Sequence, residues 1–232
     1  MFKNLTPLDA VKDKELKYKA LADFSFARSE VVCPIMFNEF VQAARCFPIV
    51  FPDGGTIIPQ ALLSINKEGN SYVSPEGQWQ GAYLPLHLRR YPFVLGQAKD
   101  NDKMLIMYDS EAPHFQHKEA ESLFSMEDGN LKPTSVLQSI EKYLLNLNKD
   151  YIVTRNLFNE LKQHDVLIKS ALNVKTKDDE AKSYSVKGFT IVDWNKVIKL
   201  DDNVLADWTR KGLIQLIHIH LLSIQGIKKS EK

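Results

Sequence analysis

The chain has 232 residues, of which 44% are apolar and 25% charged, a length and composition expected of one large soluble globular domain. Its 30 basic and 29 acidic residues leave a net charge of +1, which excludes a global basic field that would attract nucleic acid. No stretch reaches the ~18 uninterrupted apolar residues of a membrane span, and the N-terminus has no signal-peptide core. We therefore expect a cytoplasmic protein without a transmembrane segment.

The first 30 residues predict an irregular lead-in, in which the alternation of polar and aromatic residues over 23–26 is typical of a half-buried strand. Residues 34–47 then predict a helix that begins at Pro34 and ends before Pro48. Three short strands separated by turns follow, over residues 49–51, 56–65 and 71–73, with the turns at 52–55 and 66–70.

One short stretch of the chain occurs twice. Arg45–Phe51 (RCFPIVF) is followed by Arg89–Leu95 (RRYPFVL), with Arg, Pro and Val at the same positions and an aromatic residue before each proline. In the second copy, Pro85 begins a short helix and Pro92 ends it. Two strands joined by a turn come next, over 93–97 and 103–109, with the turn at 98–102. We interpret the repeat as a duplicated helix–Pro–strand element of the architecture rather than a catalytic signature.

The second half of the chain is mainly helical. Residues 109–133 are polar and turn-rich and predict a connection, which makes 110–132 the candidate place for any sub-division. Residues 134–164 predict one long helix, or two that join near 148–150, capped by Thr134 or Ser135. The remaining elements are a hairpin around the charged turn 176–182, a helical turn capped by Asp193, a helix from Asp201 or Asp202 to Gly212, and a buried helix over 213–225. We therefore expect a single α+β domain over 1–232, with short antiparallel strands in its N-terminal half.

Recognisable catalytic and metal-binding motifs are absent. On a helix, His218 and His220 would point in different directions, so packed histidines are favoured over a metal site. The acidic and histidine residues within 109–117 have no metal-ligand spacing, and Cys33 and Cys46 lie in apolar runs where thiols stay protonated. Nucleophile elbows and phosphate-binding glycine loops are missing too. We expect no catalytic residue, metal or cofactor.

Arginines at the repeated junctions are the main candidates for binding. Arg45, Arg89 and Arg90 each precede a strand and adjoin an aromatic residue. Such a guanidinium either forms a structural ion pair or lines a pocket for an anionic small molecule or a peptide carboxylate. Its candidate acidic partners are Asp23, Glu39 and Asp109. Aromatic residues around the second copy would form the walls of a groove. The candidate ligand-binding residues are therefore Arg45, Trp79, Tyr83, Arg89, Arg90, Tyr91, Asp109 and His220.

In order from about residue 5 to 225, the chain contains the segments ADFSFA, FNEFVQAARCFPIVF, GNSYVSPEGQWQGAYLPLHLRRYPFVL and GLIQLIHIHLLSI. These segments resemble the SapC family of bacterial proteins. The most specific are Arg89–Phe93 (RRYPF) and His220–Ser223 (HLLS). The histidines at 87, 114, 117 and 218 depart from the family pattern, which further weakens a metal site built from them.

The resemblance implies an accessory role and does not indicate a catalytic reaction. The family is named after a surface-layer locus, and its members often lie in clusters with TonB-dependent receptors, halogenase-like flavoproteins and cupin-like oxygenases. It supplies no catalytic residues to carry over. A transport permease of the same name is excluded, because a permease needs several apolar spans.

Three hypotheses of function follow. The first is an accessory or binding protein that recognises a protein or peptide partner without catalysis. The second is an enzyme of a tailoring cluster, in which Arg89 and Arg90 hold a carboxylate while Asp109 and His220 act as acid and base. The third is a component of a surface layer. A pocket that brings those four residues together would favour the second.

Overall fold

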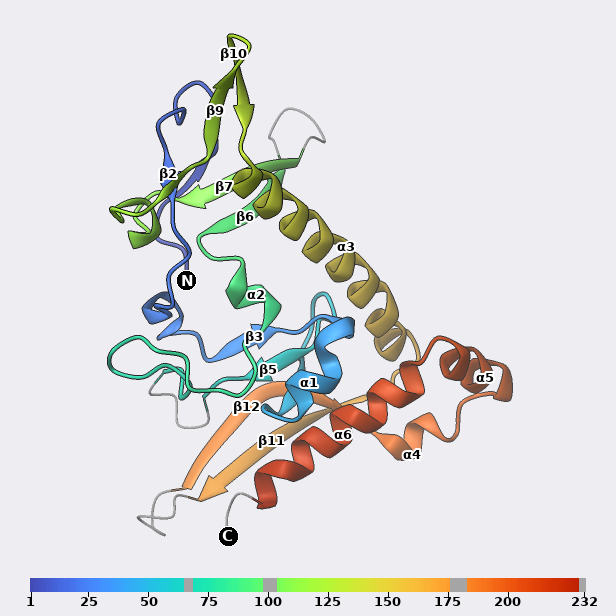
Figure 1. Ribbon diagram of the computed structural model, residues 1–232. Coiled ribbons are helices and arrows are strands. Elements are labelled where there is room, and N and C mark those ends of the chain that lie inside the picture. Colours follow the sequence, from blue (N-terminus) through green and yellow to red (C-terminus); the bar gives the residue numbers. More distant parts are fainter. Residues whose placement is uncertain (65–68, 98–103, 176–182, 230–232) are drawn as a thin grey trace.

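The protein has an α+β fold, as predicted (Figure 1). The computed structural model describes residues 1–64, 69–97, 104–175 and 183–229. All pairings between its named strands are antiparallel. The largest sheet has the order β11-β12-β4-β5-β3, with bounds Leu167–Lys175, Ser183–Val192, Ile49–Pro52, Gln60–Leu62 and Val32–Pro34. A three-stranded sheet has the order β1-β7-β6, with bounds Leu5–Pro7, Met104–Asp109 and Phe93–Gln97. Two two-stranded sheets pair β2 with β8 and β9 with β10, with bounds Lys17–Tyr18, Glu121–Ser122, Phe124–Glu127 and Asn130–Pro133.

One long helix, α3 (Ser135–Gln163), runs diagonally across the molecule from the small sheets to the five-stranded sheet (Figure 1). The C-terminal helix α6 (Leu213–Lys229) packs against β4 and β12. The other helices are α1 (Phe40–Ala44), α2 (Leu86–Arg89), α4 (Trp194–Val197) and α5 (Asp202–Arg210), with 3₁₀ turns η1 (Ser25–Ala27), η2 (Phe37–Glu39) and η3 (Pro113–Phe115). Within the described ranges, none of the helices has the length and hydropathy needed to cross a membrane.

Two apolar clusters form the main core, and α3 contributes to both. Phe158 and Leu161 of α3 belong to the larger cluster, which lies between the five-stranded sheet, α1 and α6. Leu137 and Leu144 belong to the other cluster, which contains Phe93 of β6. The helix therefore joins the two halves of the chain through its buried face.

The duplicated unit is present as secondary structure. In each copy a short helix ends at the arginine, and an antiparallel pair of strands follows the proline: β4 with β5 and β6 with β7. The Tyr91–Pro92 peptide bond is cis. The two copies join different sheets: β4 is the central strand of the five-stranded sheet, whereas β6 is an edge strand of the three-stranded sheet.

Four predictions in the first half of the chain are wrong. The strand predicted over 23–26 is a 3₁₀ turn, because the Asp23 carboxylate accepts a hydrogen bond from the Ser25 amide and bends the chain. The helix predicted from Pro34 starts later, since Pro34 ends the edge strand β3, where its missing N–H costs no ladder bond. The long strand over 56–65 is reduced to β5, which begins after Pro59, and the strand over 71–73 is reduced to a bridge between Val73 and Trp79.

The polar region before α3 is more ordered than predicted. Instead of a plain connection it contains η3, β8 and the hairpin of β9 and β10. Asp128 and Gly129 form the hairpin turn with φ of 50° and 75°, which is the combination that a two-residue type I′ turn requires. The long helix is continuous, so the alternative of two helices is excluded.

Other boundaries follow the predictions closely. The hairpin of β11 and β12, the cap at Asp193, whose carboxylate accepts from the Asn195 amide, and the last helix are all present. Thr134 occupies the cap position of α3, but its hydroxyl donates to the Ser122 and Leu123 carbonyls instead of capping. The predicted turns at 98–102 and 176–182, and part of the turn at 66–70, lie outside the described residues.

Candidate functional site

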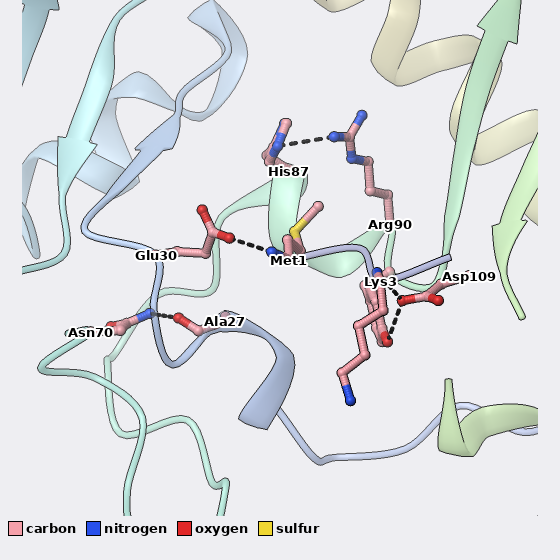
Figure 2. A network of polar contacts seen from close by, with 9 residues as sticks. Met1, Lys3, Ala27, Glu30, Asn70, His87, Arg90 and Asp109 are labelled. Carbon is pink, nitrogen blue, oxygen red and sulfur yellow. Dashed lines mark hydrogen bonds and ion pairs between the residues drawn. The ribbon is translucent and has the colours of Figure 1, made fainter. Parts of the chain in front are cut away.

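The short helix α2 places two polar side chains on one side, where its last turn meets β6. Arg90 follows α2 directly, and His87 lies one turn earlier. An Nη atom of Arg90 lies 3.0 Å from Nε2 of His87 (Figure 2). The Nε atom of Arg90 is buried and has no hydrogen-bond partner among the described residues. Such an unpaired buried donor is uncommon in a native fold and needs an explanation.

Arg90 also lacks an acidic partner. None of the ion pairs found in the described parts of the chain includes it, so its predicted pairing with Asp23, Glu39 or Asp109 is not formed. Burial lowers the pKa of Arg90, but an arginine stays charged in proteins. The Phe2 ring, whose centroid is 5.5 Å from the guanidinium carbon, offers only a weak cation–π contact.

His87 does not neutralise this charge. Burial, followed by the charge of Arg90, lowers the pKa of His87 to about 3, so the imidazole is neutral. Its Nε2 atom therefore accepts the hydrogen bond from Arg90 and carries no negative charge. The Arg90–His87 pair therefore keeps a net charge of +1, which an anion beside it would neutralise.

A cavity of about 190 Å³ opens beside this pair, between α2, η2, β6 and α3. It is lined by Met36, His87, Arg90, Leu95, Leu144, Leu147, Asn148 and Tyr151. A second cavity of about 230 Å³ shares Arg90 and Leu144 with the first and adds Arg89, Tyr91 and Tyr143. An aliphatic wall with one cation and a few polar groups suits a carboxylate on a short apolar stem.

Arg89, Tyr83 and Trp79 support α2 rather than line the first cavity. The Nε atom of Arg89 donates to the Leu84 carbonyl at 2.8 Å, and its guanidinium lies over the Tyr83 ring. The Tyr83 hydroxyl donates to the buried Glu39 carboxylate at 2.8 Å, and the Trp79 indole donates to the Tyr83 carbonyl at 2.9 Å. These bonds fix the segment that leads into α2.

Glu39 holds the start of α2 from the first copy of the repeat. Its carboxylate accepts from the Met36 and Leu86 amides, both at 2.9 Å, in addition to the Tyr83 hydroxyl. Burial raises the pKa of Glu39, and these three donors act in the opposite direction. The carboxylate therefore ties the two repeats together and is not available to Arg90.

Asp109 and Tyr91 form a separate, fully bonded group. The Lys3 amide donates to the Asp109 carboxylate at 2.9 Å (Figure 2). The Asn4 amide donates to the same carboxylate at 3.0 Å and the Tyr91 hydroxyl at 3.1 Å. Burial alone would raise the pKa of Asp109, but the backbone hydrogen bonds outweigh it and lower the pKa. Asp109 thus anchors the N-terminal segment.

His220 lies in the other half of the molecule and is also fully bonded. Its Nε2 atom accepts from the Val192 amide at 3.2 Å, so Nδ1 carries the proton and donates to the Ile49 carbonyl at 2.8 Å. The Ser223 hydroxyl accepts from the Ile49 amide at 3.0 Å. The imidazole bridges β4 and β12 just beyond their last paired residues.

The predicted ligand-binding residues are therefore only partly brought together. Arg89, Arg90 and Tyr91 share one cavity, whereas Asp109 is enclosed behind Tyr91 and His220 is remote. Arg45 is exposed at the end of α1, with no side-chain bond to other described residues. In the described part of the chain, no three His, Cys, Asp or Glu side chains are grouped as metal ligands.

Sequence reasoning missed His87 and the α3 side of the cavity. His87 precedes Arg90 by three residues, the spacing of neighbours on one helix face. Leu144, Leu147, Asn148 and Tyr151 have the spacing of one helical stripe, but a stripe does not reveal which element packs on it.

Comparison with known proteins adds one match. The family model described as SapC matches residues 8–229, a range that contains His87, Arg90 and all the cavity residues of α3. No curated protein and no solved structure matches this chain.

Proposed function

This chain belongs to the SapC family, and from that premise we propose that it is an accessory binding protein without catalytic activity. It recognises a protein or peptide partner by seating one of the partner's carboxylates beside Arg90. We place this recognition in the cytoplasm, the compartment expected from the sequence.

The observation that carries the proposal is the unpaired Nε atom of Arg90. Arg90 is half-buried, so its charge is only partly desolvated, but its Nε donor is buried, and a buried donor without an acceptor costs about 1–3 kcal/mol. A carboxylate in the cavity that Arg90 lines would bring a negative charge and accept two parallel N–H bonds from the guanidinium. Arg90 therefore has the requirements of a carboxylate site.

The size of the cavity favours a side chain over a whole metabolite. About 190 Å³ is below the ~300–1,000 Å³ of typical small-molecule pockets. Met36, Leu95 and Leu144 provide apolar walls for a short methylene stem, and Asn148 provides an amide at the side. These features support a glutamate side chain, or the end of a peptide chain, as the group that binds.

The geometry does not favour the enzyme alternative. It required Asp109 and His220 to act beside Arg89 and Arg90, but both groups are buried elsewhere with all their hydrogen bonds formed. Burial lowers the pKa of His220 to about 4, and no proton acceptor other than a backbone carbonyl contacts its Nδ1. The proposed acid and base are not positioned to exchange protons with a ligand at Arg90.

Calorimetric titration with two capped tripeptides tests the proposal. One carries a central glutamate, and the other carries glutamine, its neutral isostere. We expect saturable binding of the glutamate peptide and an affinity about ten- to a hundredfold lower for the glutamine peptide, the value of a charge-assisted hydrogen bond. Equal affinities, or no saturable binding of the glutamate peptide, would overturn the proposal.

Variants locate the site. Arg90→Met should reduce the affinity for the glutamate peptide to that of the glutamine peptide. The matched control is Arg155→Met, which removes an exposed arginine from α3 outside both cavities. Arg90→Met removes a half-buried charge and takes the donor away from Nε2 of His87, which is itself not fully buried, so we expect the variant to fold and check this by circular dichroism before the titration. Unchanged affinity in folded Arg90→Met protein would exclude Arg90 as the site.

A further inference from the structure

A third cavity borders Tyr91, which also lines the second Arg90 cavity, and its charged groups are mainly acidic instead of basic. Its volume is about 210 Å³, and it is lined by Lys3, Asp23, Ser25, Phe26, Tyr91, Glu111, Pro113 and His114. Figure 2 shows the side chains of Lys3, which lines this cavity, and of Arg90 pointing away from each other. This cavity is therefore separate from the site described above.

His114 is the residue of this cavity whose state needs an explanation. Its side chain is almost completely buried, at 3% exposure, yet the Nδ1 atom has no hydrogen-bond partner in the described ranges. The ring stacks on Tyr18 at 5.9 Å and meets the edge of Tyr91 at 5.3 Å, which fixes its orientation. Burial lowers the pKa of His114 to about 4, so at neutral pH one ring nitrogen is an acceptor.

Two carboxylates face the same cavity without a cationic partner. Asp23 and Glu111 take part in none of the ion pairs that the described residues form. Asp23 is held in place because its Oδ1 accepts from the Ser25 amide at 2.9 Å. It also packs against Gly77, where a Cβ would lie 2.3 Å from that oxygen, so only glycine leaves room for the carboxylate. The position of Asp23 is therefore built into the fold.

An aromatic wall completes the cavity. The Phe26 and Tyr91 rings stack with centroids 3.9 Å apart and an angle of 12°. Because the two rings cover each other's facing surfaces, the stack acts as an apolar wall for the methylene stem of a ligand. Two acidic groups against the single cation Lys3 leave the lining with an excess of negative charge.

We propose that this cavity binds an alkylammonium group of the partner, such as a lysine side chain, with Asp23 and Glu111 as the charge partners. The ammonium stem lies against Phe26 and Tyr91, and the unpaired ring nitrogen of His114 accepts one of the N–H bonds. The site takes the basic part of a partner whose acidic part would bind at Arg90. It stands on its own residues, however, and does not depend on the Arg90 site.

The test is a titration with capped tripeptides that carry a central lysine or its Nε-acetylated form, followed by the amide and His114 ring signals in NMR spectra. We expect saturable binding of the lysine peptide with a shift of the His114 ring signals, and at least about tenfold weaker binding of the acetylated peptide. Equal binding of the two peptides, or binding that leaves the His114 signals unchanged, would overturn the proposal.

Charge-neutral variants provide the second arm. Glu111→Gln and Asp23→Asn should each weaken binding of the lysine peptide about tenfold. Asn at 23 keeps an oxygen for the Ser25 amide, and Glu111 is exposed, so folding does not depend on that carboxylate. The control Glu141→Gln removes an exposed carboxylate from α3, outside the cavity. Wild-type affinity in Glu111→Gln would contradict the proposal, whatever the behaviour of Asp23→Asn.

The two proposed binding sites can be confirmed or disproved independently of each other. If Arg90→Met reduces the affinity for the glutamate peptide to that of the glutamine peptide and leaves binding of the lysine peptide unaffected, both assignments hold. If the lysine peptide does not bind while the glutamate peptide does, only the ammonium site is wrong.

Discussion

His220 is fully buried and Arg90 is half-buried with a buried Nε atom, and the two side chains differ in how completely they are bonded. His220 has a donor and an acceptor for its two ring nitrogens, and Asp109 likewise receives every hydrogen bond it needs. Arg90 has a neutral histidine at one nitrogen and nothing at another. Because native folds pair nearly all buried polar groups, the exceptions indicate where a ligand is expected. This contrast separates structural from functional candidates that look alike in the sequence.

The buried histidines make the stability of the fold depend on pH. Burial lowers the pKa of His114 and of His220 to about 4, whereas an unfolded histidine titrates near 6.5. Below pH 6.5 the unfolded chain binds protons that the folded chain does not, so stability falls as the pH falls towards 4. Each histidine contributes about 1.4 kcal/mol per pH unit to this loss. Urea denaturation at pH 7 and pH 5 should show a clearly lower free energy of unfolding at pH 5.

Variants isolate this effect from other titrating groups. Burial raises the pKa of Glu39, so protonation of Glu39 makes the fold relatively more stable as the pH falls, which opposes the effect of the histidines. The test therefore compares the pH dependence of stability between variants and the wild-type protein. His114→Gln and His220→Gln should each reduce the pH dependence, while exposed His117→Gln should leave it unchanged. A dependence identical in all four proteins would disprove the assignment.

At the scale of elements, α6 and β4 are joined by two side chains from the closing His220–Ser223 stretch. His220 and Ser223 satisfy the carbonyl and the amide of Ile49, the first residue after the proline of the first repeat. Ser223→Ala leaves the buried Ile49 amide without an acceptor, which should lower the free energy of unfolding by about 1–3 kcal/mol.

Ser139→Ala is the matched control for that loss. Ser139 also bonds back to its own helix, at the Ser135 carbonyl, but it is exposed and bonds no strand. Its replacement should change stability by less than about 0.5 kcal/mol. If chemical denaturation gives both variants the same free energy of unfolding, the hydrogen bond from the Ile49 amide to Ser223 does not contribute as described.

Sequence patterns predicted the elements that local chemistry decides. Pro48 and Pro92 each lie between a helix and a strand, as predicted, although α1 already ends at Ala44 and α2 at Arg89. Asp193 caps α4, also as predicted. The helix predicted to begin at Pro34 was wrong, because a proline is compatible with an edge strand as well as with the first turn of a helix. Only the order of strands in the sheet distinguishes the two cases. The Asp128–Gly129 pair is typical of a two-residue hairpin turn, but the polar residues around it led to the prediction of a plain connection.

The candidate site could be predicted only in part, for a related reason. The arginine junction is local, so Arg89, Arg90 and Tyr91 were found from the repeat. The α3 wall of the cavity and the separation of His220 from Arg90 depend on how distant segments pack. No local pattern encodes that arrangement.

At the scale of the whole molecule, α3 contributes buried residues to both apolar clusters and so connects them. Its 29 residues extend for about 44 Å, with Leu144 in one cluster and Phe158 in the other. Glu39 adds a second tie, since it bonds the segment before α2 from the first repeat. We therefore expect scanning calorimetry to give one unfolding transition, with equal calorimetric and van't Hoff enthalpies. Two resolved transitions would show that the clusters unfold independently and that the chain has two domains.

The central claim is that Arg90 is kept for the carboxylate of a partner, and the Nε–H resonance of Arg90 reports on it most directly. In an NMR titration with the glutamate peptide, this resonance should shift progressively and saturate as the unpaired donor gains an acceptor, while the glutamine peptide should leave it in place. A resonance that stays unchanged while the glutamate peptide saturates the protein, or that shifts equally with both peptides, would contradict the account.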